Sequence, residues 1–250
     1  MTSSPPGTPA PAVVRAAAIL EVISKQSDSY PRVSEIARET GVPSSSVTNI
    51  LAALVETGLV RRIGPGYAIG PTVVELASVF LRSDDPVQRF REFVPSMDDL
   101  SHETAQLGML SGGDVLFLAR YDGTQPIALT SGVGKRLPAS STAIGKAMLA
   151  RLEHAELASS LPEPLPRLTS RSHRTLADLE EDLAAIRERG HSIDDEEAAP
   201  NVVCLAVAVD SGDDEPRYAV STTLFKERLT PSLADRLVSD LTKVASYLAK

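Results

Sequence analysis

Residues 34–69 contain two short helical patterns separated by a turn, after which the spacing of apolar residues changes from about 3.6 to about 2. The first helix is expected to begin with Ser34 as its N-cap and to end at Gly41, a residue that suits a left-handed C-terminal position. The second is expected to follow Pro43 and to end at Gly58. Its apolar stripe comprises Val47, Ile50, Leu51 and Leu54. Two short helices at this separation predict a helix-turn-helix.

A longer helix is expected before this pair and a β-hairpin after it. Apolar residues recur at helical spacing over residues 12–25, namely Val13, Ala17, Leu20 and Ile23. Residues 59–63 and 67–69 read as strands on either side of the turn sequence Gly64-Pro65-Gly66. Residues 12–70 therefore predict a winged helix-turn-helix, and the Pro-rich residues 1–11 before it are expected to be a disordered tail.

The second helix of the pair presents small polar side chains on its early turns, namely Ser44, Ser45, Ser46, Thr48 and Asn49. Such groups, together with helix N-terminal N–H groups, can donate to phosphates, and an asparagine can hydrogen-bond an adenine edge. The cations expected to displace counterions from DNA are Arg15, Arg32, Arg61 and Arg62. The pattern therefore favours binding of double-stranded DNA. An interaction domain that does not bind DNA is the alternative, because residues 44–56 contain no Lys or Arg.

The charge of the chain is unevenly distributed. The formal net charge is −8, which taken alone argues against a protein that coats nucleic acid. However, the residues up to Arg82 contain 7 Lys or Arg against 6 Asp or Glu, and the rest contain 18 against 27. The two parts thus carry about +1 and −9, so the overall acidity does not exclude DNA binding by the first part.

A domain boundary is predicted at residues 82–87, which read R-S-D-D-P-V. A linker helix is expected over residues 71–88 and a second domain over residues 89–250. No apolar run has the length of a membrane helix, and no export signal is recognised at the N-terminus. With Cys204 as the single cysteine, a soluble protein in a reducing cytoplasm is expected.

Strand and helix patterns are mixed in the second domain. Strands are expected at residues 105–110, 115–121, 126–131, 202–209 and 218–224. Helices are expected at residues 86–102, with an interruption at Pro95, and at 141–152, 176–189 and 232–249. Runs of strands and helices with hairpin-type connections predict an antiparallel α+β domain.

Ser140-Ser141-Thr142 stands directly before Ala143 and Ile144 and predicts the start of a helix. The first N–H groups of a helix lack partners and carry partial positive charge, which suits a carboxylate. An ordinary capped helix packed on the sheet is equally consistent with these residues.

Enzyme and metal patterns are weak in this sequence. Gly145-Lys146 does not complete a phosphate-binding loop, because Ser140 and Ala147 stand where a Gly and a Ser or Thr are required. His191 with the acidic residues 194–197 could bind a metal ion, yet such a charge run is usually a solvated loop. Cys204 lies among aliphatic residues without an identifiable base. Neither an enzymatic activity nor a metal or cofactor is therefore expected.

Four segments resemble the IclR family of bacterial transcription regulators. They are R-A-A-A-I-L at residues 15–20, the run over residues 34–62, G-V-G-K-R-L-P-A-S-S-T-A-I-G-K-A-M-L-A at residues 132–150, and D-D-E-E-A-A-P-N-V-V-C-L-A-V-A-V at residues 194–209. The resemblance covers nearly the whole chain in colinear order. It implies an α+β protein in which an N-terminal winged helix-turn-helix is joined by a linker helix to a GAF-like antiparallel α/β effector-binding domain.

The resemblance also implies an effector site for a small organic acid. Its residues would be Leu129, Leu137, Ala143, Ile144, Asp194, Val202 and Cys204, with Ala143 and Ile144 acting through their backbone amides. Asp194 would repel an anionic ligand unless it accepts a hydrogen bond from a ligand hydroxyl or is itself protonated. A hydroxy acid or a hydrated keto acid meets the first condition. A buried, inert thiol is an equally good interpretation of Cys204.

The implied function is sequence-specific transcription regulation, with repression as the expected sign. The partners would be a DNA operator, a small organic-acid effector, and further copies of the chain in a homodimer or a dimer of dimers. The family often has Lys at the position of Ser44 and Arg at that of Asn49, so weaker phosphate anchoring is expected from this helix. A ligand-binding or interaction protein whose winged helix no longer binds DNA is the alternative.

Overall fold

The computed structural model describes residues 10–25, 29–83, 85–125, 127, 131–210 and 217–250. The chain divides into two compact units, residues 1–83 and 84–250. Each unit has its own core, and each is described by itself. In the described part of the chain, no helix has the length and apolar character needed to cross a membrane.

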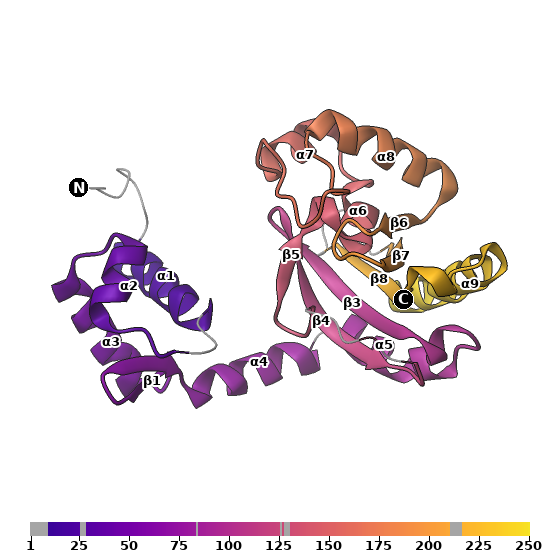
Figure 1. Ribbon diagram of the computed structural model, residues 1–250. Helices are drawn as coiled ribbons and strands as arrows, with labels where there is room; N and C mark the ends of the chain where they lie inside the picture. Colours follow the sequence, from indigo (N-terminus) through magenta and orange to yellow (C-terminus); the bar gives the residue numbers. More distant parts are fainter. Residues whose placement is uncertain (1–9, 26–28, 84, 126, 128–130, 211–216) are drawn as a thin grey trace. The chain divides into compact units, whose positions relative to one another are not determined.

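In the described part of the first unit there are four helices and a two-stranded sheet (Figure 1). The elements are α1 (Pro11–Lys25), α2 (Val33–Thr40), α3 (Ser44–Glu56), β1 (Val60–Ile63), β2 (Gly66–Ile69) and α4 (Pro71–Ser83). Helices α1, α2 and α3 pack on one another through the fully buried Ile19, Ile36 and Leu51. Gly41 ends α2 with a left-handed φ of 68°, which allows the sharp turn into α3. The predicted winged helix-turn-helix is confirmed.

The sequence placed two details of this unit wrongly. Helix α2 begins at Val33, so Ser34 lies inside its first turn, and the Glu35 carboxylate accepts the Arg32 N–H at 2.7 Å instead of a serine cap. Val13 is 66% exposed, because only the second half of α1 packs against the other helices. The residues of α1 that this packing buries are Ile19, Val22 and Ile23.

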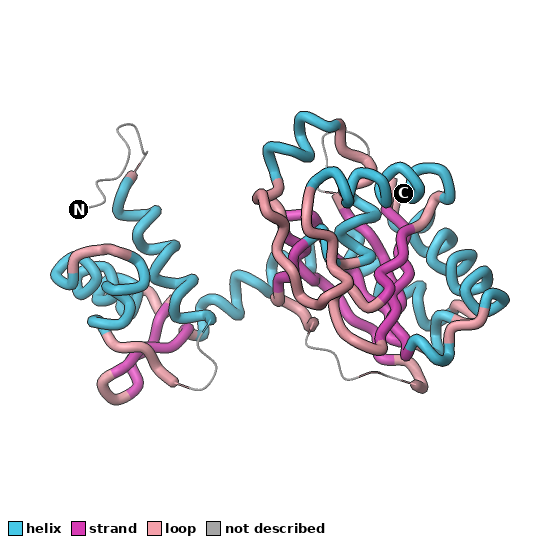
Figure 2. The backbone as a smooth tube through the Cα atoms, turned by 45° about the horizontal axis from the view of Figure 1, so that its top comes forward, coloured by secondary structure: helices cyan, strands magenta, loops and turns pink. Residues whose placement is uncertain are grey.

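An antiparallel sheet forms the centre of the second unit (Figure 2). Among the described residues it has six strands, in the order β5-β4-β3-β8-β7-β6. The strands are β3 (Thr104–Ser111), β4 (Asp114–Asp122), β5 (Arg136–Pro138), β6 (Ser192–Asp195), β7 (Val202–Ala208) and β8 (Tyr218–Phe225). The helices are α5 (Asp85–Phe93), α6 (Ala143–Leu149), α7 (His154–Ser160), α8 (Leu176–Arg189) and α9 (Pro231–Leu248). The predicted antiparallel α/β domain is confirmed.

Helices cover both faces of this sheet (Figures 1 and 2). On one face α6 contacts β7, β8 and β6, and α8 packs on α6; Ile144, Met148 and Leu183 belong to this core. Helix α9 packs on β7 and β8 from the other face and contacts α5. Helix α6 is thus enclosed between the sheet and α8, so every one of its seven residues is buried.

Several element boundaries differ from the sequence expectations. Strands β5 and β6 and helix α7 were not predicted, because segments of three to seven residues carry little periodicity. The helix expected over residues 141–152 is shorter, since a 3₁₀ helix at Ala139–Ser141 precedes α6. Helix α5 ends at Phe93, just before the predicted interruption at Pro95. The expected linker helix, residues 71–88, corresponds to α4 and the first turn of α5, and the strand expected at residues 126–131 falls mostly outside the described residues.

Candidate functional site

Helix α3 carries the polar side chains that were predicted to meet DNA. Val47, Leu51 and Leu54 form its buried face. Ser44, Ser45, Thr48 and Asn49 are exposed, and Ser46 is half-buried. The N-cap of α3 is Pro43, which provides no side-chain acceptor, so no side chain caps the N–H groups of the first turn. These N–H groups remain available to a phosphate, whereas the Thr48 hydroxyl already donates to the Ser44 carbonyl at 2.9 Å.

The predicted arginines lie outside α3, in three other places of the first unit. Arg61 and Arg62 are exposed on β1, Arg32 is exposed just before α2, and Arg15 is half-buried on α1. The Tyr67 N–H donates to the Pro31 carbonyl at 3.1 Å, which ties the hairpin to the segment that carries Arg32.

The hairpin approaches that segment so closely that only glycine fits at position 66. A Cβ atom on Gly66 would lie 2.2 Å from the Tyr30 carbonyl oxygen. The close approach and the hydrogen bond place the hairpin against Tyr30 and Pro31, directly before Arg32.

The second unit contains a pocket between α6 and the sheet. Its volume is about 50 Å³. Six of the seven predicted effector residues line it, namely Leu137, Ala143, Ile144, Asp194, Val202 and Cys204. The seventh, Leu129, lies outside the described residues. The sequence missed the other lining residues, which are Gln106, Phe117, Ser131, Thr142, Ala198, Ala199, Ser221 and Thr223.

Strand register explains how polar residues from distant segments meet in the pocket. Asp194 on β6 is opposite Cys204 on β7, and Cys204 is opposite Thr223 on β8. One step along the same face, Ser221 on β8 is opposite Gln106 on β3. No local signal in the sequence gives these pairings, because they depend on which strands are neighbours.

Gln106 supplies an unused hydrogen-bond donor in this pocket. Its side chain is only 3% exposed, and its Oε1 accepts from the Ser131 hydroxyl at 3.2 Å. Its Nε2 is buried and has no hydrogen-bond partner among the described residues. Leaving a buried donor unpaired costs stability, so the pocket favours an occupant with an acceptor at this point.

Asp194 is a buried carboxyl on the same wall, 2% exposed. Its Oδ1 accepts the backbone N–H groups of Glu197 at 2.7 Å and Ala198 at 3.2 Å. Burial and, second to it, the nearby Glu197 carboxylate raise the pKa of Asp194 to about 7, because the two backbone hydrogen bonds offset only part of their effect. Near neutral pH the Asp194 carboxyl therefore exists in both protonation states. In its protonated state it can donate a hydrogen bond to the carboxylate of a bound organic acid.

Cys204 is a neutral thiol at this site. Its Sγ lies 3.3 Å from the Thr223 hydroxyl oxygen. Burial, and next the charge of Asp194, raise the pKa of Cys204 well above its usual range. A thiol that does not ionise is a poor nucleophile, so the geometry favours a contact residue over a covalent catalyst.

Helix α6 is held rigidly above the pocket. The Thr142 hydroxyl accepts the Gly145 N–H at 3.1 Å, so Thr142 is the N-cap that was expected within residues 140–142. A Cβ on Gly145 would lie 2.2 Å from the Ala139 carbonyl oxygen, so this glycine is required by close packing. Lys146 is fully buried and its ammonium group bonds to Asp182, Glu197 and the Ile193 carbonyl. Gly145-Lys146 is therefore structural and does not bind phosphate.

A winged helix-turn-helix and a separate domain whose pocket contains buried polar groups define a DNA-binding regulator with an effector domain. Residues 12–64 match the family model described as the IclR helix-turn-helix domain, and residues 80–250 match that described as the bacterial transcriptional regulator IclR C-terminal domain. The chain belongs to the IclR family, whose members are transcription regulators rather than enzymes.

Relatives with known names support this assignment. HTH-type transcriptional regulator BhcR of Paracoccus denitrificans is 33% identical over 201 residues, which cover 79% of this chain and 71% of that protein. Transcriptional repressor IclR of Escherichia coli is 29% identical over 225 residues, covering 87% and 81%.

Solved structures show the same fold. An IclR transcriptional regulator from Alicyclobacillus acidocaldarius has a TM-score of 0.84 at 21% identity, covering 96% of this chain and 98% of that one. An IclR homologue from Microbacterium hydrocarbonoxydans, complexed with 4-hydroxybenzoate, has a TM-score of 0.75 at 22% identity, covering 95% and 98%.

Proposed function

We propose that this regulator is a repressor whose operator affinity changes when a small hydroxylated organic acid binds in the pocket of the second unit. Two polar groups on one pocket wall carry the proposal. They are Gln106 Nε2, a buried donor without a hydrogen-bond partner among the described residues, and the buried carboxyl of Asp194. A ligand carboxylate can accept from Gln106, and a ligand hydroxyl can bond to Asp194 in either protonation state.

The names of relatives agree with this class of effector and this sign of regulation. The Escherichia coli relative is named a repressor, as is the acetate operon repressor of Salmonella typhimurium, which is 28% identical over 251 residues. The bound ligand of the Microbacterium homologue, 4-hydroxybenzoate, carries both a carboxylate and a hydroxyl. Those properties belong to the relatives and support the proposal for this chain only by analogy.

Operator binding is assigned to α3 and the β1–β2 hairpin. The uncapped N-terminal N–H groups of α3 and Arg32, Arg61 and Arg62 would contact phosphates, and Asn49 would read a base edge. Linkage supplies the mechanism, because an effector that binds one arrangement of the regulator better than another shifts operator affinity by the same coupling free energy.

The chain is further proposed to act as a homodimer or a dimer of dimers. Helix α4 exposes several apolar side chains, with Val74 69%, Leu76 60% and Val79 56% exposed. A second copy would cover such a surface and would place two recognition helices at half-sites about one helical turn apart. Sedimentation of the native chain and of Leu76→Asp tests this, with a loss of the oligomer expected in the variant.

Selection of bound DNA from a random pool tests the proposed function. The enriched sequence is then measured in gel shifts over a range of salt concentrations, with and without a panel of small aliphatic and aromatic hydroxy acids. A specific complex that one of these acids weakens is expected. Absence of a specific complex at every salt concentration would favour the alternative, a ligand-binding protein whose winged helix no longer binds DNA.

A further inference from the structure

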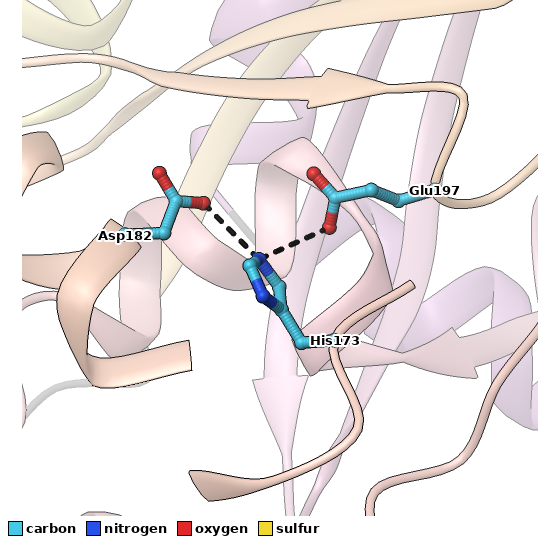
Figure 3. A group of neighbouring side chains, drawn as sticks. All are labelled: His173, Asp182 and Glu197. Carbon is cyan, nitrogen blue, oxygen red and sulfur yellow. Dashed lines mark ion pairs between the residues drawn. The ribbon is translucent and has the colours of Figure 1, made fainter. Parts of the chain in front are cut away.

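Three ionisable side chains, His173, Asp182 and Glu197, converge outside the lining of the effector pocket (Figure 3). His173 precedes α8, Asp182 lies on α8, and Glu197 follows β6. The Nε2 atom of His173 is 3.5 Å from Asp182 Oδ2 and 3.6 Å from Glu197 Oε2. Figure 3 shows the imidazole nitrogen directed at the gap between the two carboxylates.

Two atoms of this cluster lack hydrogen bonds. His173 Nε2 and Glu197 Oε2 are both buried, and neither has a hydrogen-bond partner among the described residues. Glu197 is 7% exposed, so water does not reach its free oxygen readily. At 3.5 and 3.6 Å the imidazole nitrogen is almost equally far from the two carboxylate oxygens, and both distances are longer than an ordinary hydrogen bond.

The buried ammonium group of Lys146 does not satisfy the free oxygen. Its Nζ donates to Asp182 Oδ2 at 2.6 Å, to the Ile193 carbonyl at 2.7 Å and to Glu197 Oε1. An ammonium has three donors, and all three are in use. Lys146 thereby orients the two carboxylates and leaves Glu197 Oε2 facing the imidazole.

The two separations from His173 Nε2 match the edge length of a tetrahedral metal site, and the three candidate ligand atoms all lie within 4.8 Å of one another. Ligand atoms about 2.0–2.2 Å from a tetrahedral zinc ion lie about 3.3–3.6 Å from one another. One imidazole nitrogen with two carboxylate oxygens is a donor set that suits zinc, whereas calcium and magnesium prefer six or more oxygen ligands. We propose that His173 Nε2, Asp182 Oδ2 and Glu197 Oε2 bind a divalent transition-metal ion of the zinc type, with water in the fourth position.

The ion would join three parts of the second unit, namely the segment before α8, α8 itself and the segment after β6. The backbone N–H of Glu197 donates to Asp194, so an ion bound to the Glu197 side chain would also restrain one wall of the pocket. Because Asp182 Oδ2 is shared with Lys146, the two cations compete and the affinity is expected to be moderate. The site differs from the one considered from the sequence, since Asp195 and Glu196 pair instead with Arg171 and Lys226.

Calorimetry tests the proposal. The full chain is first freed of metal with a chelator and is then titrated with Zn²⁺. One ion per chain is expected to bind, and His173→Ala is expected to weaken binding at least about tenfold. Two controls should bind like the native chain: His154→Ala, which removes an exposed histidine paired with Glu180, and Cys204→Ser, which removes the pocket thiol. Co²⁺ bound in place of Zn²⁺ should show the visible absorption of a tetrahedral site, lost in His173→Ala.

His173→Gln provides a second variant if His173→Ala does not fold, with folding checked by circular dichroism in chelator. No saturable Zn²⁺ binding by the native chain would overturn the proposal. Equal Zn²⁺ affinity of the native chain and the folded His173 variant would also overturn it. Loss of Zn²⁺ binding in Cys204→Ser alone would overturn it too, because the ion would then lie in the effector pocket.

Discussion

Asp194 and Cys204 are opposite each other in the antiparallel pair β6–β7, and both side chains line the pocket of the second unit. The pairing places a carboxyl with a pKa of about 7 next to a thiol that stays protonated. At neutral pH the thiol is therefore uncharged, and the carboxyl can be protonated and uncharged as well. A pocket wall of this kind can accept an anionic ligand without the repulsion that an ordinary aspartate would cause.

Replacing Asp194 tests its proposed contact with the effector. Asp194→Ala is expected to lower the affinity for an acid that acts in the panel by about tenfold or more, because one buried hydrogen bond is lost. Operator affinity without the effector should remain unchanged. Calorimetry and gel shifts measure the two quantities, and Asp195→Ala, at the more exposed end of β6, is the matched control. Unchanged effector affinity in Asp194→Ala would remove this residue from the site.

Gln106 offers a second test of the same pocket. Gln106→Glu replaces the unpaired donor with a group that repels a carboxylate, so effector affinity should fall by at least about tenfold. Gln106→Leu should also weaken binding, by less, because the donor is lost without added charge. Both affinities are measured by calorimetry. An acid that binds Gln106→Glu as tightly as the native chain would show that its carboxylate lies elsewhere.

Two substitutions separate phosphate contacts from base reading in the first unit. Arg61→Ala is expected to weaken binding to all DNA sequences and to reduce the slope of log affinity against log salt by about 1.

Asn49→Ala is expected to cost about 1–3 kcal/mol of binding free energy at one operator position and to relax the base preference there. Gel shifts on the selected operator and its single-base variants measure both effects. Arg236→Ala, in the second unit, is the control, and an Asn49→Ala protein with unchanged base preferences would contradict the assigned role.

Asp240 on α9 is expected to set part of the acid sensitivity of folding. Its Oδ2 accepts the backbone N–H groups of Asp99 and Leu100 at 3.0 and 3.2 Å, and its Oδ1 accepts from Lys243 at 2.9 Å. Burial opposes ionisation, but these hydrogen bonds outweigh it, so the pKa of Asp240 lies below its usual value. A carboxyl with a lowered pKa in the folded state stabilises the fold above its unfolded pKa and loses this effect as the pH falls through its folded pKa.

Asp240→Asn should therefore lower the free energy of unfolding by about 1–3 kcal/mol at pH 7. The difference from the native chain should persist down to about pH 4 and shrink below that. Urea unfolding at a series of pH values measures it. Asp235→Asn, on an exposed position of the same helix, should show no such difference. A difference that grows as the pH falls would contradict the assigned sign.

The sequence was informative wherever a local pattern decides the structure. Gly41 and the stripe through Val47 and Leu51 predicted the helix-turn-helix, because turn conformation and helical period are properties of neighbouring residues. Resemblance to the IclR family added two segments, which contain nine of the pocket-lining residues, and six of these nine were named in advance as effector residues. Strand β6 was missed, because its four residues include two aspartates and carry no strand-like alternation.

By itself the sequence determined the family and the α+β fold with a helix-turn-helix and a second domain. It also determined six pocket residues, through the segments 132–150 and 194–209 that resemble the family. Only the tertiary structure decided that Gln106, Thr223 and Asp194 share a wall, and that Lys146 turns two carboxylates toward His173. The physical reason is that local motifs depend on backbone conformation over a few residues. Pocket chemistry instead depends on strand order and register, which bring together side chains more than a hundred residues apart.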